Sequence, residues 1–267
     1  MTGGSLVKLE QLKSNLRDMG SVAIGFSGGV DSSFLLKVAS DVLGERVLAI
    51  TINSSLFSKH ELEDALKFVK ENKIHHIVID LDVEEIEHIQ ENPENRCYFC
   101  KKHIFSKIKD IADQENISFV LDASNYDDLK DYRPGMKALE RFGVVSPLID
   151  VKITKKEIRE FSKQMNLDTW NKPAFACLAS RIPYGTEITK SKLKKVELAE
   201  GFIRNLGVKQ FRVRYHDDIA RIEILKNDFE KVLNNSNEIT RKFKAIGFKY
   251  VTLDIQGYRA GSLNEVL

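Results

Sequence analysis

The chain has 267 residues, of which 42% are hydrophobic and 30% are charged, a composition typical of a globular protein with one or two domains. Lys and Arg outnumber Asp and Glu by only 41 to 39, so no strong overall charge favours a nucleic acid partner. Neither a signal peptide nor a membrane-spanning run of roughly 20 apolar residues is recognisable. We therefore expect a cytoplasmic protein whose cysteines stay reduced.

Apolar strand-like runs alternate with helical patterns over residues 1–170. The predicted strands are SVAIGF, RVLAITI, HHIVIDLD and SFVLDAS. The predicted helices are SSFLLKVASDVLG, KHELEDALKFVKENKI, a Glu-rich segment after residue 82, CYFCKKHIFSKIKDIA and GMKALERFG. This alternation predicts an α/β domain with a doubly wound parallel sheet that carries helices on both faces.

The pattern changes after residue 170. Residues 171–190 have no sustained period and read as a long active-site loop or linker. Residues 191–267 predict a smaller α+β domain with the helix KLKKVELAEGFIRNLGV, the strands QFRVRYH and IARIEIL, the helix NDFEKVLNNSNEITRKFKAIG and the strand KYVTLDI. We therefore predict two domains joined by this loop.

The segment GFSGGVDSS lies between a predicted strand and a predicted helix, where the amides of a helix start favour phosphate. Glycines allow close backbone approach and serines supply donors, whereas an aspartate would act through a metal ion or as a helix cap. A glycine pair alone is usually an ordinary turn, but the whole segment favours a nucleotide site. The candidate contacts are Ser27, Gly28, Gly29, Asp31, Ser32 and Ser33.

This segment lacks the lysine of a Walker loop and resembles the SGGxDS signature of the PP-loop ATP pyrophosphatases. The resemblance implies that the chain binds ATP with Mg²⁺ and cleaves it between the α and β phosphates to adenylate an oxygen. Ligands of open α/β sheets bind at the carboxyl ends of the strands. Asn125 and Asp128, in DASNYDD after a predicted strand, are therefore candidate ribose or metal contacts, or else ordinary turn formers.

The chain has three cysteines. Cys97 and Cys100 are three residues apart near the start of a predicted helix, and Cys177 lies in the long loop. Each one alone reads as a buried bystander. Three thiolates together suit an iron–sulfur cluster with one open iron, to which sulfide could bind.

Five segments, NPENRCYFCK, DYRPGMKAL, ACLASRIPYGTEIT, QFRVRYH and LDIQGYRAGSLNE, together resemble the LarE family over nearly the whole chain. These are ATP-dependent sulfurtransferases acting on pyridinium-3,5-biscarboxylic acid mononucleotide in nickel-pincer nucleotide biosynthesis. The resemblance implies this small-molecule substrate and a homohexamer. In one branch of the family Cys177 would sacrifice its own sulfur, and in the other Cys97, Cys100 and Cys177 would hold a [4Fe-4S] cluster. The three-cysteine form favours the second branch.

The segment FRVRY places Arg212 and Arg214 on one face of a predicted strand, where they would form a phosphate site or a merely solvated edge. The resemblance adds Ser180 and Arg181 to the substrate phosphate site and implies a catalytic role for Glu200. Two other functions stay open, a PP-loop tRNA thiolase and a nucleotide sensor without catalysis. A near-neutral charge balance disfavours the first, and the cysteine triad disfavours the second.

Overall fold

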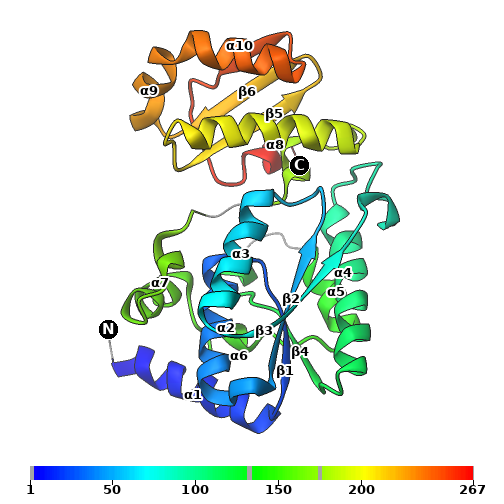
Figure 1. The fold of residues 1–267 in the computed structure, drawn as a ribbon, viewed down its shortest axis with the longest axis vertical. Helices are drawn as coiled ribbons and strands as arrows, with labels where there is room; N and C mark the ends of the chain where they lie inside the picture. The colour runs from blue at the N-terminus through cyan, green and yellow to red at the C-terminus, as the bar shows by residue number, and fades with distance from the viewer. Residues whose placement is uncertain (1–2, 131–133, 174–175, 267) are drawn as a thin grey trace. The chain divides into compact units, whose positions relative to one another are not determined.

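A computed structural model describes residues 3–130, 134–173 and 176–266 (Figure 1). The chain divides into two compact units. Unit 1 comprises Met1–Glu87 with Asn95–Ala174, and unit 2 comprises His88–Glu94 with Phe175–Leu267. Residues 131–133 of the quoted segment DYRPGMKAL lie outside the described residues. Within the described ranges, no helix combines the length and apolar character that crossing a bilayer requires.

Unit 1 is built on a four-stranded sheet in the order β3-β2-β1-β4. Its strands are β1 Val22–Gly25, β2 Val47–Asn53, β3 His75–Asp80 and β4 Phe119–Leu121. Every pair in this sheet is parallel. The predicted α/β fold with a parallel sheet is therefore confirmed.

Alternate residues of the strands pack against helices on opposite faces, which explains why the strands read as nearly continuous apolar runs. Val22 and Ile24 belong to one apolar cluster, whereas Ala23 between them belongs to another. The first cluster draws on α1 Gly3–Met19, α2 Val30–Leu43, α3 Lys59–Glu71, α6 Pro147–Asp150 and α7 Lys155–Gln164. The second draws on α4 Arg96–Gln114 and α5 Met136–Arg141 (Figure 1).

The prediction of a helix in the Glu-rich segment after residue 82 was wrong. Asp82 caps only one turn of 3-10 helix, Val83–Glu85. His88 and Asn92 then adopt positive φ angles of 57° and 50°, which no α-helix contains. The apolar spacing there comes from side chains buried along an irregular segment: Val83, Ile86 and Ile89.

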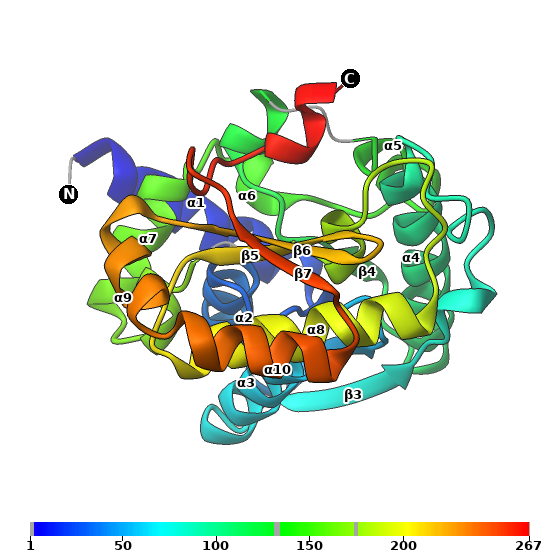
Figure 2. The same cartoon turned by 90° about the horizontal axis from the view of Figure 1, so that it is seen from above.

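Unit 2 contains a three-stranded sheet in the order β5-β6-β7, with β5 Phe211–His216, β6 Ile219–Ile224 and β7 Tyr250–Leu253. The predicted strand pair is confirmed as antiparallel, and β7 joins β6 in parallel. Helices α8 Lys190–Asn205 and α10 Ser236–Ile246 pack together against the sheet (Figure 2). Phe243 lies between Phe202 and Phe248, with ring centroids 6.4 and 6.1 Å away.

The predicted helix over residues 227–247 is in fact two helices. The first is α9, Phe229–Asn234, and α10 begins at Ser236. Between them Asn235 has a ψ of 13°, and its side-chain amide donates to the Lys231 carbonyl at 2.8 Å. Asn side chains compete in this way with the helical backbone and so break helices.

Residues 88–94 join unit 2 through Asn92, which is fully buried. Its side-chain amide donates to the carbonyls of Pro183 and Thr186 at 2.7 and 3.1 Å. Its own carbonyl accepts from the Gly185 amide at 3.0 Å. This short segment therefore supports the loop that precedes α8.

Helix α1 was not predicted from the sequence. Leu12 and Leu16 anchor it in the core. Ser5 and Lys8 donate to the carboxylate of Glu157, which also accepts from the backbone and hydroxyl of Thr154 at the start of α7. Burial alone would raise the pKa of Glu157, but these hydrogen bonds outweigh it and lower the pKa to about 2.

We predict that Glu157→Gln lowers the free energy of unfolding by about 1–3 kcal/mol at pH 7. Because the folded-state pKa is depressed, the wild-type contribution is complete above about pH 4.5 and is lost as the pH falls toward 2. Urea unfolding at several pH values should therefore show the two proteins converging in acid. Glu160→Gln, at an ion pair of 4.0 Å on the same helix, is the control and should change little. A constant difference between wild type and Glu157→Gln down to pH 2 would contradict this account.

Candidate active site

The segment SGGVDSS forms the end of the connection from β1 and the first turn of α2, as predicted (Figure 1). Gly28 has a φ of +68°, and a Cβ there would lie 3.1 Å from the Cβ of Ala65 on α3. Gly29 has an ordinary φ of −78°, and a Cβ there would meet only the hydroxyl of Ser27, at 3.4 Å. The conformation thus requires glycine at position 28, whereas at position 29 a side chain would mainly obstruct an approaching ligand.

The residue at the start of α2, Gly29, has no side chain with which to cap the helix. The hydroxyls of Ser27 and Ser32 lie 3.1 Å apart, and Ser32 donates to the Gly29 carbonyl at 3.2 Å. The Ser33 hydroxyl is fully buried and has no hydrogen-bond partner in the part of the chain that the structure describes. Uncapped amides and hydroxyls at a helix start form an arrangement suited to phosphate.

Two lysines that the sequence analysis did not single out reach this connection. Lys155, at the start of α7, forms an ion pair with Asp31 at 2.5 Å. Lys172 donates to the Gly28 carbonyl at 3.0 Å and to the Asp64 carboxylate at 2.6 Å. No sequence pattern indicates either residue, because single lysines are common and both contacts join distant parts of the chain.

Asn125 and Asp128 follow β4, as predicted, but both take part in a turn. The Asn125 side chain accepts from the Asp127 amide, and the Asp128 carboxylate accepts from the Asn125 amide, each at 3.0 Å. Asp122, which the sequence analysis missed, is buried at the end of β4 and accepts from Lys101 and Ser146 at 3.2 and 2.6 Å.

Cys97 and Cys100 lie in the first turns of α4, and the predicted helix is confirmed. Cys97 is exposed, Cys100 is half-buried, and the side chain of Asn95 does not cap this helix start. Cys177 is half-buried and belongs to unit 2, directly before a turn of 3-10 helix, Leu178–Arg181. The ranges that the structure describes contain no group of three or more His, Cys, Asp or Glu positioned to hold a metal ion. The shared cluster therefore stays a prediction.

In unit 2 the segment around Cys177 is held by an arginine. Arg181 is 1% exposed and forms two hydrogen bonds with the carboxylate of Glu200, at 2.8 and 3.0 Å. It also donates to the Cys177 carbonyl at 3.0 Å and to the Ser180 hydroxyl at 2.8 Å. Glu200 accepts as well from the Val213 amide at 3.0 Å. Glu200 is therefore a buried, fully paired carboxylate, and its catalytic role stays a prediction.

Arg212 and Arg214 share one face of β5, and both are buried, so the solvated-edge alternative was wrong. Arg214 forms two hydrogen bonds with Glu223, at 3.0 and 2.8 Å, and donates to the Ser180 carbonyl at 2.7 Å. Arg212 lies over the ring of Tyr258, 5.2 Å from its centroid. Glu223 is fully buried and was missed by the sequence analysis.

The buried charges of unit 2 are not balanced. Among its described residues the buried charged side chains are three arginines and two glutamates: Arg181, Arg212, Arg214, Glu200 and Glu223. Burial and the neighbouring Arg181 lower the pKa of Arg212 to about 10. An excess of buried positive charge favours an anionic ligand.

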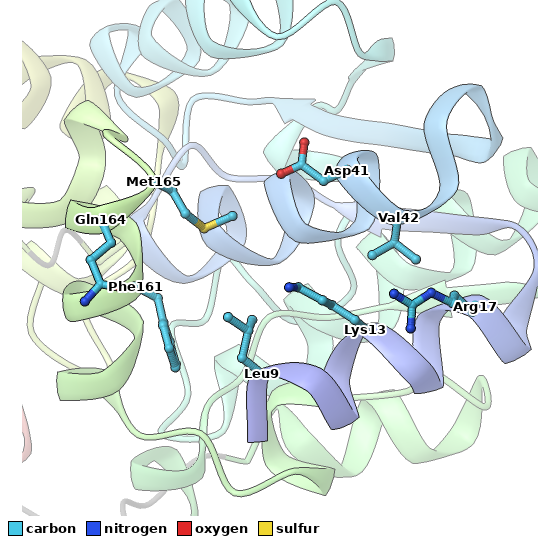
Figure 3. A pocket seen from close by; sticks show the side chains of 8 residues that line it. All are labelled: Leu9, Lys13, Arg17, Asp41, Val42, Phe161, Gln164 and Met165. Carbon is cyan, nitrogen blue, oxygen red and sulfur yellow. The ribbon is translucent and has the colours of Figure 1, made fainter. Parts of the chain in front are cut away.

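A separate cavity of about 390 Å³ lies among α1, α2 and α7 (Figure 3). Leu9, Val42 and Phe161 line it together with Lys13 and Arg17. Val42 stands at the opposite end of α2 from the SGGVDSS segment. This cavity therefore contains none of the predicted site residues.

Comparison of the sequence with known proteins identifies the family of this chain. Residues 7–111 match the family model described as NAD synthase. The chain is 41% identical to an uncharacterized protein of Synechocystis sp., over 97% of this chain and 98% of that protein. It is 37% identical to the pyridinium-3,5-bisthiocarboxylic acid mononucleotide synthase of Lactiplantibacillus plantarum, over 97% of this chain and 95% of the synthase. One chain of the glutamine-hydrolyzing GMP synthase of Thermoplasma volcanium is 26% identical over 69% of this chain and 64% of its own length.

The similarity to the Lactiplantibacillus synthase extends over almost the whole of both chains, and the SGGVDSS connection has the strand–loop–helix geometry of a PP-loop. The protein therefore belongs to the LarE family of PP-loop ATP pyrophosphatases.

Proposed function

We propose that this enzyme is an ATP-dependent sulfurtransferase that converts carboxylates of pyridinium-3,5-biscarboxylic acid mononucleotide into thiocarboxylates. The name of the Lactiplantibacillus relative, which gives the bisthiocarboxylic product, supports this proposal. The observation that carries it is the buried arginine network around Cys177, because Arg181 binds the Cys177 carbonyl within a cluster that has excess positive charge. That arrangement would hold an anionic substrate beside a thiol.

In the first step a substrate carboxylate oxygen attacks the α-phosphorus of ATP. The bond from that phosphorus to the oxygen that bridges the α and β phosphorus atoms breaks. The start of α2 and the hydroxyls of Ser27, Ser32 and Ser33 would bind the departing pyrophosphate. Asp31 fits a Mg²⁺ ion, since that ion uses few carboxylates and takes most other ligands from water and phosphates. When bound, Mg²⁺ would neutralise charge on the phosphates.

In the second step sulfur attacks the adenylated carbonyl carbon, the bond to the AMP oxygen breaks and AMP leaves. Three cysteine thiolates are the ligands that iron–sulfur clusters prefer, so Cys97, Cys100 and Cys177 would hold a [4Fe-4S] cluster. When bound, such a cluster would supply the sulfide for this attack. The hydrogen bonds from Arg181 and Ser180 to the Cys177 carbonyl, at 3.0 and 2.7 Å, fix the backbone that carries this thiol.

The substrate class is tested by measuring pyrophosphate release from ATP. We expect release only when the pyridinium carboxylate is added. Release that requires tRNA would favour a tRNA thiolase, and no release with either would favour a nucleotide sensor.

Sedimentation of the same preparation tests the hexamer, which stays a prediction.

For the phosphate loop we predict that Gly29→Val abolishes pyrophosphate release while the protein stays folded. The φ of −78° suits valine, but its branched side chain would obstruct a phosphate approaching the loop. Gly201→Ala is the control, because a Cβ at Gly201 meets no atom within 4 Å. Undiminished pyrophosphate release by folded Gly29→Val would remove the phosphate role from this loop.

For the arginines we predict that Arg212→Lys raises the KM for the pyridinium mononucleotide about tenfold without changing the KM for ATP. Lysine keeps the charge but loses the planar fork that binds a phosphate at two points. Arg221→Lys is the control, since Arg221 lies on the neighbouring strand β6, donates to Glu223 and is 38% exposed. Equal KM values for wild type and Arg212→Lys would exclude this arginine from the substrate site.

For the cysteines we predict that changing Cys97, Cys100 or Cys177 to Ala abolishes cluster assembly and sulfur transfer but leaves adenylation largely intact. Anaerobic reconstitution of the wild type should give about four irons per chain. Intact mass after a single turnover distinguishes the sacrificial mechanism. Loss of one hydrogen sulfide from Cys177, with full activity of Cys97→Ala and Cys100→Ala, would overturn the cluster proposal.

A further inference from the structure

The SGGVDSS loop has no lysine of its own, yet a lysine from a distant segment binds its backbone. Lys172 lies 144 residues after Gly28 and donates to the Gly28 carbonyl at 3.0 Å. Its side chain is 15% exposed, and its ammonium group also pairs with Asp64 at 2.6 Å. Lys155, by contrast, contacts the Asp31 side chain and is 32% exposed. Lys172 is therefore the better placed of the two lysines to influence the loop backbone.

The carbonyl that Lys172 holds belongs to the peptide between Gly28 and Gly29. No peptide bond among the described residues is cis, so the Gly29 N–H points away from the Gly28 carbonyl. That N–H lies on the side of the serine hydroxyls, 3.4 Å from the Ser27 oxygen. The length of this contact shows that Ser27 binds the amide only weakly. Fixing the carbonyl thus directs the Gly29 amide toward the position that a phosphate would take.

The backbone of Lys172 is itself held in place. Arg159, on α7, donates to the carbonyls of Trp170 and Lys172 at 2.7 and 2.9 Å. The Lys172 amide donates to the Thr169 carbonyl at 3.0 Å. A lysine whose backbone is fixed in this way loses less conformational entropy when it holds the loop.

We propose that Lys172 is a positioning residue for the phosphates of the nucleotide, fixing the Gly28–Gly29 peptide so that the Gly29 amide faces them. This inference rests on the proposed binding of ATP at SGGVDSS. The charge of Lys172, partly balanced by Asp64, also lies beside the site of the departing pyrophosphate. The chain thereby places next to its loop the cation that a Walker loop carries within its own sequence.

The test compares how adenylation is inhibited by inorganic pyrophosphate, which is released in the first step, and by AMP, which is released in the second. Lys172→Met should raise the inhibition constant for pyrophosphate about tenfold and leave that for AMP within about twofold, because the amide it orients faces the pyrophosphate. Lys172→Arg should restore most of the pyrophosphate affinity, since it keeps a charged donor. Lys156→Met is the control, because Lys156 is 87% exposed and pairs only at 4.0 Å.

Calorimetric titration of pyrophosphate separates this inference from the proposed function. A wild-type protein that binds neither ATP nor pyrophosphate would overturn both. Tight pyrophosphate binding by wild type and Lys172→Met alike would overturn only the role of Lys172. Parallel loss of pyrophosphate and AMP affinity with a lower Tm would show a merely structural role. If Lys172→Met does not fold, Asp64→Asn provides the same comparison, with an expected weakening of about threefold for pyrophosphate alone.

Discussion

A buried guanidinium group must find acceptors for its N–H groups, and this requirement organises the second unit. Arg181 and Arg214 each meet one carboxylate with two hydrogen bonds, and each also donates to the backbone between residues 176 and 180, Arg181 to the carbonyls of Ala176 and Cys177 and Arg214 to that of Ser180. Removing a single partner from such a pair costs about 3–5 kcal/mol, because the other charge is left buried alone. Glu200 and Glu223 therefore fix the backbone beside Cys177, although neither is close to it in sequence.

In the first unit the corresponding constraint comes from the parallel sheet. Strands that run in one direction bring the starts of the following helices to one edge, where backbone amides lack partners. The connection from β1 to α2 is shaped there by contacts from α3, since Ala65 leaves no room for a side chain at Gly28 and Asp64 pairs with Lys172. Helix α3 thus supports the loop through packing and charge together.

Local periodicity was enough to predict the strands β1 to β7 and helices such as α2 and α8, because each has an apolar pattern that its own segment displays. Periodicity failed where the surroundings of a side chain depend on contacts between distant parts of the chain. Alternation placed Arg212 and Arg214 on one face, but only the fold brings Ser180 and Ser262 over that face. Lys172, Lys155 and Glu223 carry no pattern of their own, and α1 depends on a carboxylate more than 140 residues away.

The support that Asn92 gives to the loop before α8 affects how the second unit can be isolated. A C-terminal fragment beginning at residue 175 would lack the side chain that binds the carbonyls of Pro183 and Thr186. Those carbonyls would then have to accept hydrogen bonds from water or change position, and the loop would lose the contacts that fix its conformation. The unit is therefore built from two separate stretches of the chain. A stable excised version needs residues 88–94, either added as a peptide or joined to the fragment by circular permutation.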